Sequence, residues 1–238
     1  MEHVSLREHD SGVVTLSVDR PPANAMDVTL LRELVATVEQ VANDPPRALV
    51  LSGRPGFFSA GVDLKLVPGY GPEEDREMVA SINAMALGVY ALPCPVVGAI
   101  TGHAIAGGLV LALCTDIRVA SSAGRYGLTE IKVGVPYPQA AIGIVAAELP
   151  PHAARVLALG NELVGAAECL RLGVFDGVHP PDVVLPRALE LAAGLAAFPP
   201  DTYARTKRDL RGATTERLRA AAAEDPLLAN WVDKKETG

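Results

Sequence analysis

The sequence lacks the patterns that define several large classes of protein. Its three cysteines, Cys94, Cys114 and Cys169, are widely spaced in 238 residues and form no CxxC pair, so neither a disulfide framework nor a zinc site is indicated. No apolar run reaches the roughly 18 residues that a membrane span needs, and the charged N-terminal segment is unlike a secretory signal. We therefore expect a cytoplasmic protein with no membrane partner and no bound metal.

Blocks of positive charge are also missing. The net charge is −7, and no run of lysine or arginine is visible. Because the nucleic-acid backbone is bound by a basic face, nucleic acid is not expected as a partner. A small polyanionic ligand is not excluded, since a few basic side chains or helix N-termini can hold it locally.

The residues that are present predict strands alternating with helices around one core. Apolar residues make up 49% of the chain, which is enough for one substantial core. The alternating run over residues 12–18 and the apolar run over residues 48–51 predict strands. Between them, Asp27 is a candidate N-cap of a helix that ends near residues 43–46.

The same alternation continues along the chain. A helix is predicted over about residues 73–92, a strand over 96–100, a short helix over 109–114 and a strand over 116–120. From Ala140 onward helical patterns dominate. The order of elements predicts a layered α/β core followed by a helical C-terminal region.

Three segments contain residues suited to chemistry. Residues 58–65 place small residues after a strand, and residues 102–108 form a glycine-rich turn between a strand and a helix. Such a turn exposes unpaired amides at the positive end of a helix, which suits an oxyanion or a phosphate. Phosphate is the weaker interpretation, because the P-loop Lys-Ser/Thr pair and the GxGxxG spacing are absent. The third segment, residues 126–134, contains one carboxylate, Glu130, and an isolated glutamate is usually a solvated surface group.

Together and in this order, the segments resemble the enoyl-CoA hydratase/isomerase (crotonase) family over nearly the whole chain. Residues 58–65, FSAGVDLK, resemble the family signature FxAGxDLK, and residues 95–108, PVVGAITGHAIAGG, resemble its second signature. Residues 21–26, PPANAM, resemble its early loop near the adenine and pantetheine groups. The resemblance implies an α/β crotonase (ClpP-like) fold of repeated ββα units in residues 1–190 and a helical oligomerisation region in residues 191–238. It also implies a homotrimer or a hexamer.

The resemblance also implies roles for individual residues. The N–H groups of Val62 and Gly107 would form an oxyanion hole for an acyl-CoA thioester, and Glu130 would be the catalytic base. Coenzyme A would be part of the substrate, with no metal or separate cofactor. The residues expected to bind substrate are Ala23, Ala25, Ser59, Ala60, Asp63, Leu64, Ala106, Val110, Thr129, Tyr137 and Lys207.

The chain departs from the family's hydratases at two places. Hydratases generally use two glutamates, and the position of the first is Val110 here, while the second is retained as Glu130. A Gly-Gly pair that usually follows the second glutamate is also absent from residues 135–141. Adding water requires two proton-handling roles, which one carboxylate serves less readily. The pattern therefore resembles the single-glutamate Δ3-Δ2-enoyl-CoA isomerases.

Other functions stay open at this stage. A hydratase that recruits another acid, and thioester hydrolysis or decarboxylation at the same oxyanion hole, all suit this fold. A non-catalytic acyl-CoA-binding protein or scaffold is the alternative from another class. For single residues, plain solvation of Lys207, a turn-holding role for Asp63 and core packing of Tyr137 are the alternatives to substrate binding.

Overall fold

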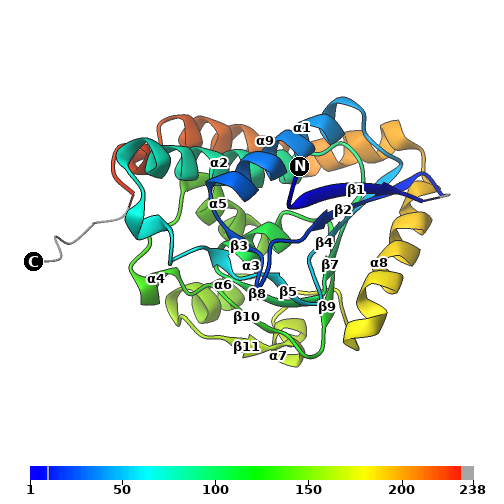
Figure 1. The fold of residues 1–238 in the computed structure, drawn as a ribbon. Helices are drawn as coiled ribbons and strands as arrows, with labels where there is room; N and C mark the ends of the chain where they lie inside the picture. The colour runs from blue at the N-terminus through cyan, green and yellow to red at the C-terminus, as the bar shows by residue number, and fades with distance from the viewer. Residues whose placement is uncertain (10, 232–238) are drawn as a thin grey trace, which may run out of the picture.

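A six-stranded sheet forms the centre of the protein in a computed structural model, which describes residues 1–9 and 11–231 (Figure 1). The strands β1 and β2 form an antiparallel hairpin, and all the other neighbours in this sheet are parallel. In spatial order the strands are β1 (Val4–Glu8), β2 (Val13–Val18), β4 (Ala48–Ser52), β7 (Val96–Ile100), β9 (Ile117–Ser121) and β12 (Gly177–His179).

A second, four-stranded sheet contains shorter strands. Its order is β11 (Val164–Gly165), β10 (Arg125–Gly127), β8 (Gly102–Ile105) and β5 (Gly56–Ser59). The strands β5, β8 and β10 run parallel to one another, so their carboxyl ends meet at the same edge of the sheet. A separate two-stranded parallel pair joins β3 (Ala25–Met26) to β6 (Gly61–Val62).

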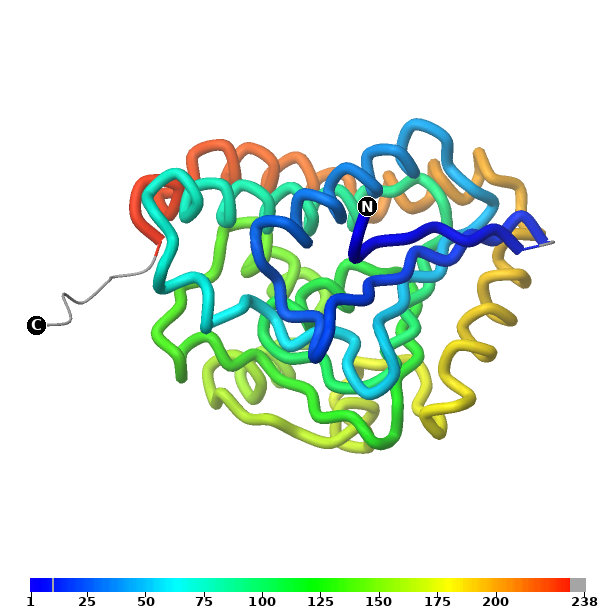
Figure 2. Tube along the Cα trace, in the orientation of Figure 1, coloured from blue at the N-terminus to red at the C-terminus, as the bar shows by residue number. Residues whose placement is uncertain are grey.

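Helices cover both faces of the six-stranded sheet. In Figure 1, α1, α2 and α9 lie along one side of the molecule and α8 lies along another, where it packs on β4 and β7. Figure 2 shows the last described residues of the chain beside the start of α2. The longer helices are α1 (Val28–Asn43), α2 (Pro72–Tyr90), α5 (Gln139–Glu148), α8 (Pro181–Ala196) and α9 (Pro200–Ala223). The shorter ones are α3 (Gly107–Leu113), α4 (Glu130–Val133), α6 (Pro151–Ala154), α7 (Ala166–Arg171), η1 (Val67–Gly69), η2 (Arg155–Leu159) and η3 (Pro226–Leu228).

Most of the predicted elements are confirmed within a few residues. The carboxylate of Asp27 accepts a 2.8 Å hydrogen bond from the amide of Leu30, as an N-cap does. The helix that begins there buries Leu31, Leu34 and Val38 against the core. Such elements are predictable because their caps and periodic apolar residues lie within one short stretch of sequence.

The C-terminal third differs from the prediction. It is not purely helical, because β11 and β12 complete the edges of the two sheets. The predicted boundary at residue 190 falls inside α8, whose buried residues Val184, Ala188 and Ala192 recur every four positions and face the six-stranded sheet. The helix α8 therefore belongs to the core, and the C-terminal helical region begins with α9. Strands of two or three residues are too short to show an alternating pattern, which is why β11 and β12 were not predicted.

Across residues 1–9 and 11–231, no single helix is both long and apolar enough to cross a membrane, and α8 with the segment Pro200–Leu228 meets that standard only jointly, across a 105° bend. Within the same residues, no three His, Cys, Asp or Glu side chains lie together as a metal site requires.

Candidate active site

Three parallel strands bring the three chemically informative segments to one place. Tyr126 in β10 pairs with Ala104 in β8, and Ser59 in β5 pairs with the same residue from the other side. Past the strand ends, the amide of Ala106 still donates a 2.8 Å hydrogen bond to the carbonyl of Gly127. The segments that follow β5, β8 and β10 therefore meet at one edge of the sheet.

The segment after β5 is held in a fixed conformation by hydrogen bonds. The hydroxyl of Ser59 accepts a 3.1 Å bond from the amide of Gly61. Two residues further on, the amide of Asp63 donates a 2.9 Å bond to the carbonyl of Met26 in β3. Because successive peptide groups of an extended strand point to opposite sides, the N–H of Val62 points away from β3.

The segment after β8 presents a second amide. Ala106 has φ 52° and ψ −127°, a conformation that a residue with a Cβ rarely adopts and that is found more often at functional sites. Gly107 begins α3, so its N–H belongs to the first turn, which has no partner within the helix. A Cβ on Gly108 would lie 2.2 Å from the carbonyl oxygen of Ser59, and one on Gly61 would lie 3.0 Å from the nitrogen of Gly107. Only glycine permits these two segments to pack so closely.

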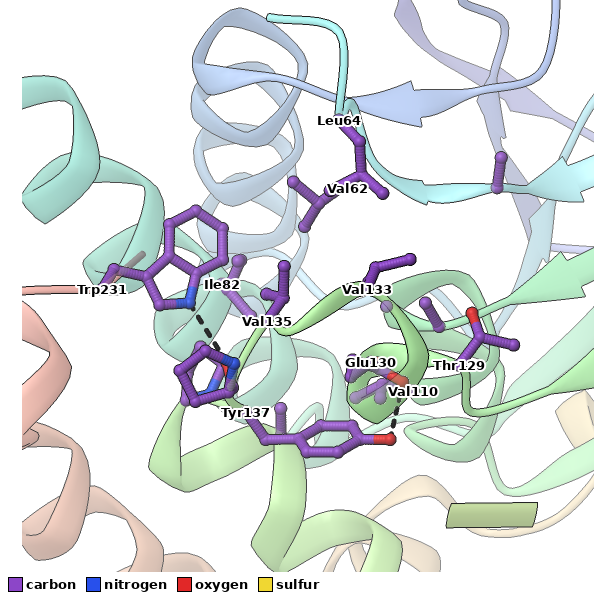
Figure 3. Close-up of a pocket in the computed structure, with 16 residues that line it drawn as sticks. Val62, Leu64, Ile82, Val110, Thr129, Glu130, Val133, Val135, Tyr137 and Trp231 are labelled. Atoms are coloured by element: carbon purple, nitrogen blue, oxygen red, sulfur yellow. Dashed lines mark hydrogen bonds between the residues drawn. The ribbon is translucent and has the colours of Figure 1, made fainter. Parts of the chain in front are cut away.

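A mostly apolar pocket lies beside the two amides (Figure 3). Its volume is about 70 Å³. Glu130 supplies the one carboxylate among the lining residues that the structure describes. The pocket is lined by Ala60, Val62, Leu64, Ile82, Ala106, Gly107, Val110, Thr129, Glu130, Val133, Val135, Pro136, Tyr137, Pro138, Ala141 and Trp231.

The carboxyl group of Glu130 lies in this pocket and has a raised pKa. It follows β10 at the start of α4, and 7% of its surface is exposed. Burial raises the pKa of Glu130 to about 7, and a hydrogen bond from Tyr137 opposes that rise. The hydroxyl of Tyr137 donates this bond to Oε2 of Glu130 over 2.6 Å, as Figure 3 shows. A carboxyl group with a pKa near neutral is suited to accepting a proton and returning it.

The structure brings most of the predicted site residues to the pocket. Besides the two amide-bearing residues and Glu130, the predicted substrate-binding residues that line it are Ala60, Leu64, Ala106, Val110, Thr129 and Tyr137. Val110 is apolar and 1% exposed.

Four of the predicted substrate-binding residues do not line the pocket and instead make contacts within the segments that form it. The hydroxyl of Ser59 is buried, Ala25 pairs with Gly61 in the two-stranded pair, and the carbonyl of Ala23 accepts a 3.0 Å bond from the amide of Ala60. Asp63 forms a 3.0 Å ion pair with Arg20.

Arg20 was not identified from the sequence. Its guanidinium bridges Asp63 to Asp27, at 3.0 and 2.9 Å, and donates to the carbonyl of Ala25. It thereby joins the loop that follows β6 to the N-terminus of α1. A lone arginine far from Asp63 in the sequence gives no local signal of this contact.

The structure does not bring Lys207 to this pocket. Its Nζ lies 2.8 Å from Oδ2 of Asp116 and 3.2 Å from the carbonyl oxygen of Cys94, and the residue is 8% exposed. Arg211 pairs with the other oxygen of Asp116 at 2.7 Å. These contacts tie α9 to the ends of β7 and β9, which gives the lysine a structural role where coenzyme A binding was predicted.

Part of the pocket wall carries no signal in the sequence. Ile82 comes from α2, while Val133, Val135 and Pro136 follow Glu130, and Trp231 comes from the end of the described chain. Trp231 is the only tryptophan in the sequence, but no motif surrounds it that would have connected it to Glu130.

The chain is similar to known proteins of one family. The family model for enoyl-CoA hydratase/isomerase matches residues 8–237. Human mitochondrial enoyl-CoA delta isomerase 1 is 35% identical over 233 residues, which are 93% of this chain and 74% of that protein. The probable enoyl-CoA hydratase EchA17 of Mycobacterium tuberculosis is 34% identical over 206 residues, 86% of this chain and 78% of that protein.

A solved structure has the same fold. The crystal structure of human mitochondrial delta3-delta2-enoyl-CoA isomerase superposes with a TM-score of 0.86 at 29% identity, covering 96% of this chain and 90% of that one. The crotonase fold expected from the motifs is confirmed. The chain belongs to the enoyl-CoA hydratase/isomerase family and is an enzyme of the crotonase type.

Proposed function

We propose that this enzyme is a Δ3-Δ2-enoyl-CoA isomerase that uses Glu130 as its one base. The observation that carries the proposal is that, among the described residues lining the pocket, only Glu130 has a carboxylate. The position at which hydratases of the resembled family have another glutamate is occupied by the buried, apolar Val110. One carboxylate suits a reaction that removes a proton and returns it to the same substrate.

The proposed reaction moves a double bond without changing the composition of the substrate. Glu130 takes a proton from C2 of a 3-enoyl thioester, and the electron pair of the broken C–H bond spreads onto the thioester oxygen. The N–H groups of Val62 and Gly107 donate to that oxygen. The protonated Glu130 then delivers the proton to C4, which leaves the double bond between C2 and C3.

The two backbone donors suit the charge that develops in this reaction. They are held by strand pairing and by close glycine packing, so they need no rearrangement when the charge appears. Losing one donor of this kind costs about 10²–10³-fold in rate in a well-studied enzyme. The position of the backbone at Val62 and Gly107 is therefore more important than either side chain.

Glu130 is oriented for proton transfer through one of its oxygens. The hydroxyl of Tyr137 donates to Oε2 and not to Oε1. Oε1 is therefore the atom that we assign to proton exchange with C2 and C4. We further propose that coenzyme A enters only as part of the substrate and that the enzyme assembles as a homotrimer or a hexamer.

The test compares the wild-type enzyme with Glu130→Gln on two substrates. We expect the wild type to convert a trans-3-enoyl-CoA to the 2-enoyl isomer with no gain in mass, and Glu130→Gln to lose about 10²–10⁴-fold in rate. Glu39→Gln, an exposed change of the same chemistry on α1, is the matched control. Hydration of a trans-2-enoyl-CoA, seen as a mass increase of one water, would make the enzyme a hydratase. Binding without turnover of either thioester would favour a non-catalytic role.

A further inference from the structure

An aromatic side chain forms part of the pocket wall on the side away from Glu130. Trp231 is 3% exposed and lines the pocket together with Ile82 of α2 and Val135. Figure 3 shows Trp231 and Glu130 on opposite sides of Val135. A group that reacts at Glu130 and extends along the pocket therefore meets the indole ring.

Trp231 is fixed in place by a hydrogen bond of its own. Its indole N–H donates to the carbonyl oxygen of Pro136 over 3.1 Å. The polar edge of the ring is thus satisfied, and the apolar face is available to the pocket, which is the usual arrangement of a buried tryptophan. The ring lies against the same stretch of chain that carries Tyr137, the partner of Glu130.

The segment that leads to Trp231 is anchored by a buried carboxylate. Asp225 is 3% exposed, and its Oδ2 accepts bonds from the side-chain amide of Asn83 at 3.0 Å and from the backbone amide of Gln139 at 2.8 Å. Its Oδ1 accepts a 3.0 Å bond from the amide of Leu227, and this bond caps the N-terminus of η3. These contacts hold the end of α9 against α2 and the start of α5. Figure 2 shows the last described residues beside the start of α2. The indole ring is therefore a rigid wall and not a loosely placed tail.

The size of the pocket limits what can reach that wall. Its volume is about 70 Å³, whereas an apolar cavity of about 150 Å³ holds one benzene molecule with its six carbon atoms. By that scale the pocket holds about three carbon atoms. An acyl group of about that size fits, and one of eight or more carbon atoms does not unless the wall moves.

We infer that Trp231 determines the acyl-chain length that this enzyme accepts, by closing the pocket to all but short-chain acyl thioesters. This inference rests on the proposed function, because it takes an acyl thioester to be the ligand. It assigns to one residue near the C-terminus a specificity that no motif in the chain indicates.

The first test measures kcat/KM for the 3-butenoyl, 3-hexenoyl, 3-octenoyl and 3-decenoyl thioesters of coenzyme A. Since one methylene too many in a tight pocket costs about 10-fold or more, the wild type should prefer the butenoyl thioester to the octenoyl thioester by at least about 10-fold. Trp231→Ala should remove most of that preference, and Trp231→Phe, which keeps a ring, should be intermediate. Phe198→Ala, an exposed aromatic change, is the control and should leave the preference unchanged.

Two results would overturn the inference. One is a wild type that accepts all four chains equally well. The other is a Trp231→Ala enzyme, shown to be folded by circular dichroism, in which activity falls by the same factor on every chain length, as expected of a residue that only supports the fold.

A second test needs neither a variant nor turnover. Because Trp231 is the only tryptophan, tryptophan fluorescence reports on this wall alone. Butyryl-CoA should change the emission in a saturable way, and octanoyl-CoA should bind at least about 10-fold more weakly. Equal affinities, or bound butyryl-CoA with unchanged emission, would contradict the inference. If the wild type isomerised no thioester, the proposed function would fail, while this binding comparison would still decide the role of Trp231.

Discussion

The phenolic hydroxyl of Tyr137 lies 2.6 Å from Oε2 of Glu130 and donates a hydrogen bond to it inside a largely apolar pocket. Burial alone would favour the neutral carboxyl group, and this hydrogen bond favours the charged one. The two effects leave the pKa of Glu130 at about 7. In the proposed reaction, Tyr137 is therefore a positioning residue that both orients Glu130 and adjusts the pH at which it accepts a proton.

Replacing Tyr137 with phenylalanine should remove the hydrogen bond to Glu130 while leaving the carboxyl group buried. A hydrogen bond to a charged group contributes about 1.5–3 kcal/mol, and one pKa unit corresponds to about 1.4 kcal/mol. In Tyr137→Phe we expect the pKa of Glu130 to rise by about one to two units, so that the pH midpoint of kcat/KM moves upward. A residue that merely packs in the core would lower the rate without moving the midpoint.

The pH profile of kcat/KM for the wild-type enzyme should have one ascending limb, near neutral pH. Glu130 must be deprotonated to accept the C2 proton, and burial raises its pKa to about 7. Below that pH, kcat/KM should fall about tenfold per unit, and above it the rate should level off. The measurement is the pH profile of kcat/KM for isomerisation. A midpoint near the ordinary pKa of glutamate would mean that Glu130 is solvated during turnover or is not the base.

Replacement by alanine should destabilise the protein more at Gly108 than at Gly107, the two glycines at the start of α3. A Cβ on Gly107 would lie 3.6 Å from Sδ of Met26, an ordinary contact, whereas one on Gly108 would lie 2.2 Å from the carbonyl oxygen of Ser59. We expect Gly107→Ala to fold with a stability change of about 1 kcal/mol or less, and Gly108→Ala to lose about 1–3 kcal/mol or more. Urea unfolding of both variants measures this difference. Equal losses would show that the two segments are not packed as closely as described.

The ion network around Asp116 should contribute to stability and not to substrate affinity. Asp116 accepts bonds from Lys207 and Arg211, so Asp116→Ala leaves the buried Lys207 without a carboxylate partner and Arg211 with Glu148 alone. We expect the free energy of unfolding to fall by about 3–5 kcal/mol. The matched control is Asp209→Ala, which breaks an exposed pair with Arg205 and should cost less than about 1 kcal/mol.

Lys207→Met tests the same network by removing a cation instead of the carboxylate. We expect it to lower the urea midpoint while leaving the KM for an acyl-CoA substrate unchanged, because Lys207 is directed at Asp116 and Cys94. If Lys207 instead bound a phosphate of coenzyme A, the variant would raise KM with little loss of stability.

Much of this protein follows from local sequence. The cap at Asp27, the strand over β7 and the glycine-rich turn that ends at Gly108 each depend on residues within a few positions of one another. Backbone conformation is decided over that same short range, since caps, glycines and apolar periodicity act on neighbouring peptide groups. The α/β order and the motifs could therefore be predicted from the sequence, and the family resemblance of those motifs implied Glu130 as candidate base.

Other features required the chain to be packed. The bond from Tyr137 to Glu130, the wall formed by Trp231 and the burial of Lys207 beside Asp116 each depend on how helices and loops settle against the sheets. Trp231 reaches the pocket because the end of α9 is anchored to α2 and α5, and the raised pKa of Glu130 exists because apolar neighbours exclude water. The sequence by itself determined which groups can act, because side-chain chemistry and local backbone conformation are written in neighbouring residues. The tertiary structure alone decided which of those groups meet and how much water surrounds them, because packing joins residues that are far apart along the chain.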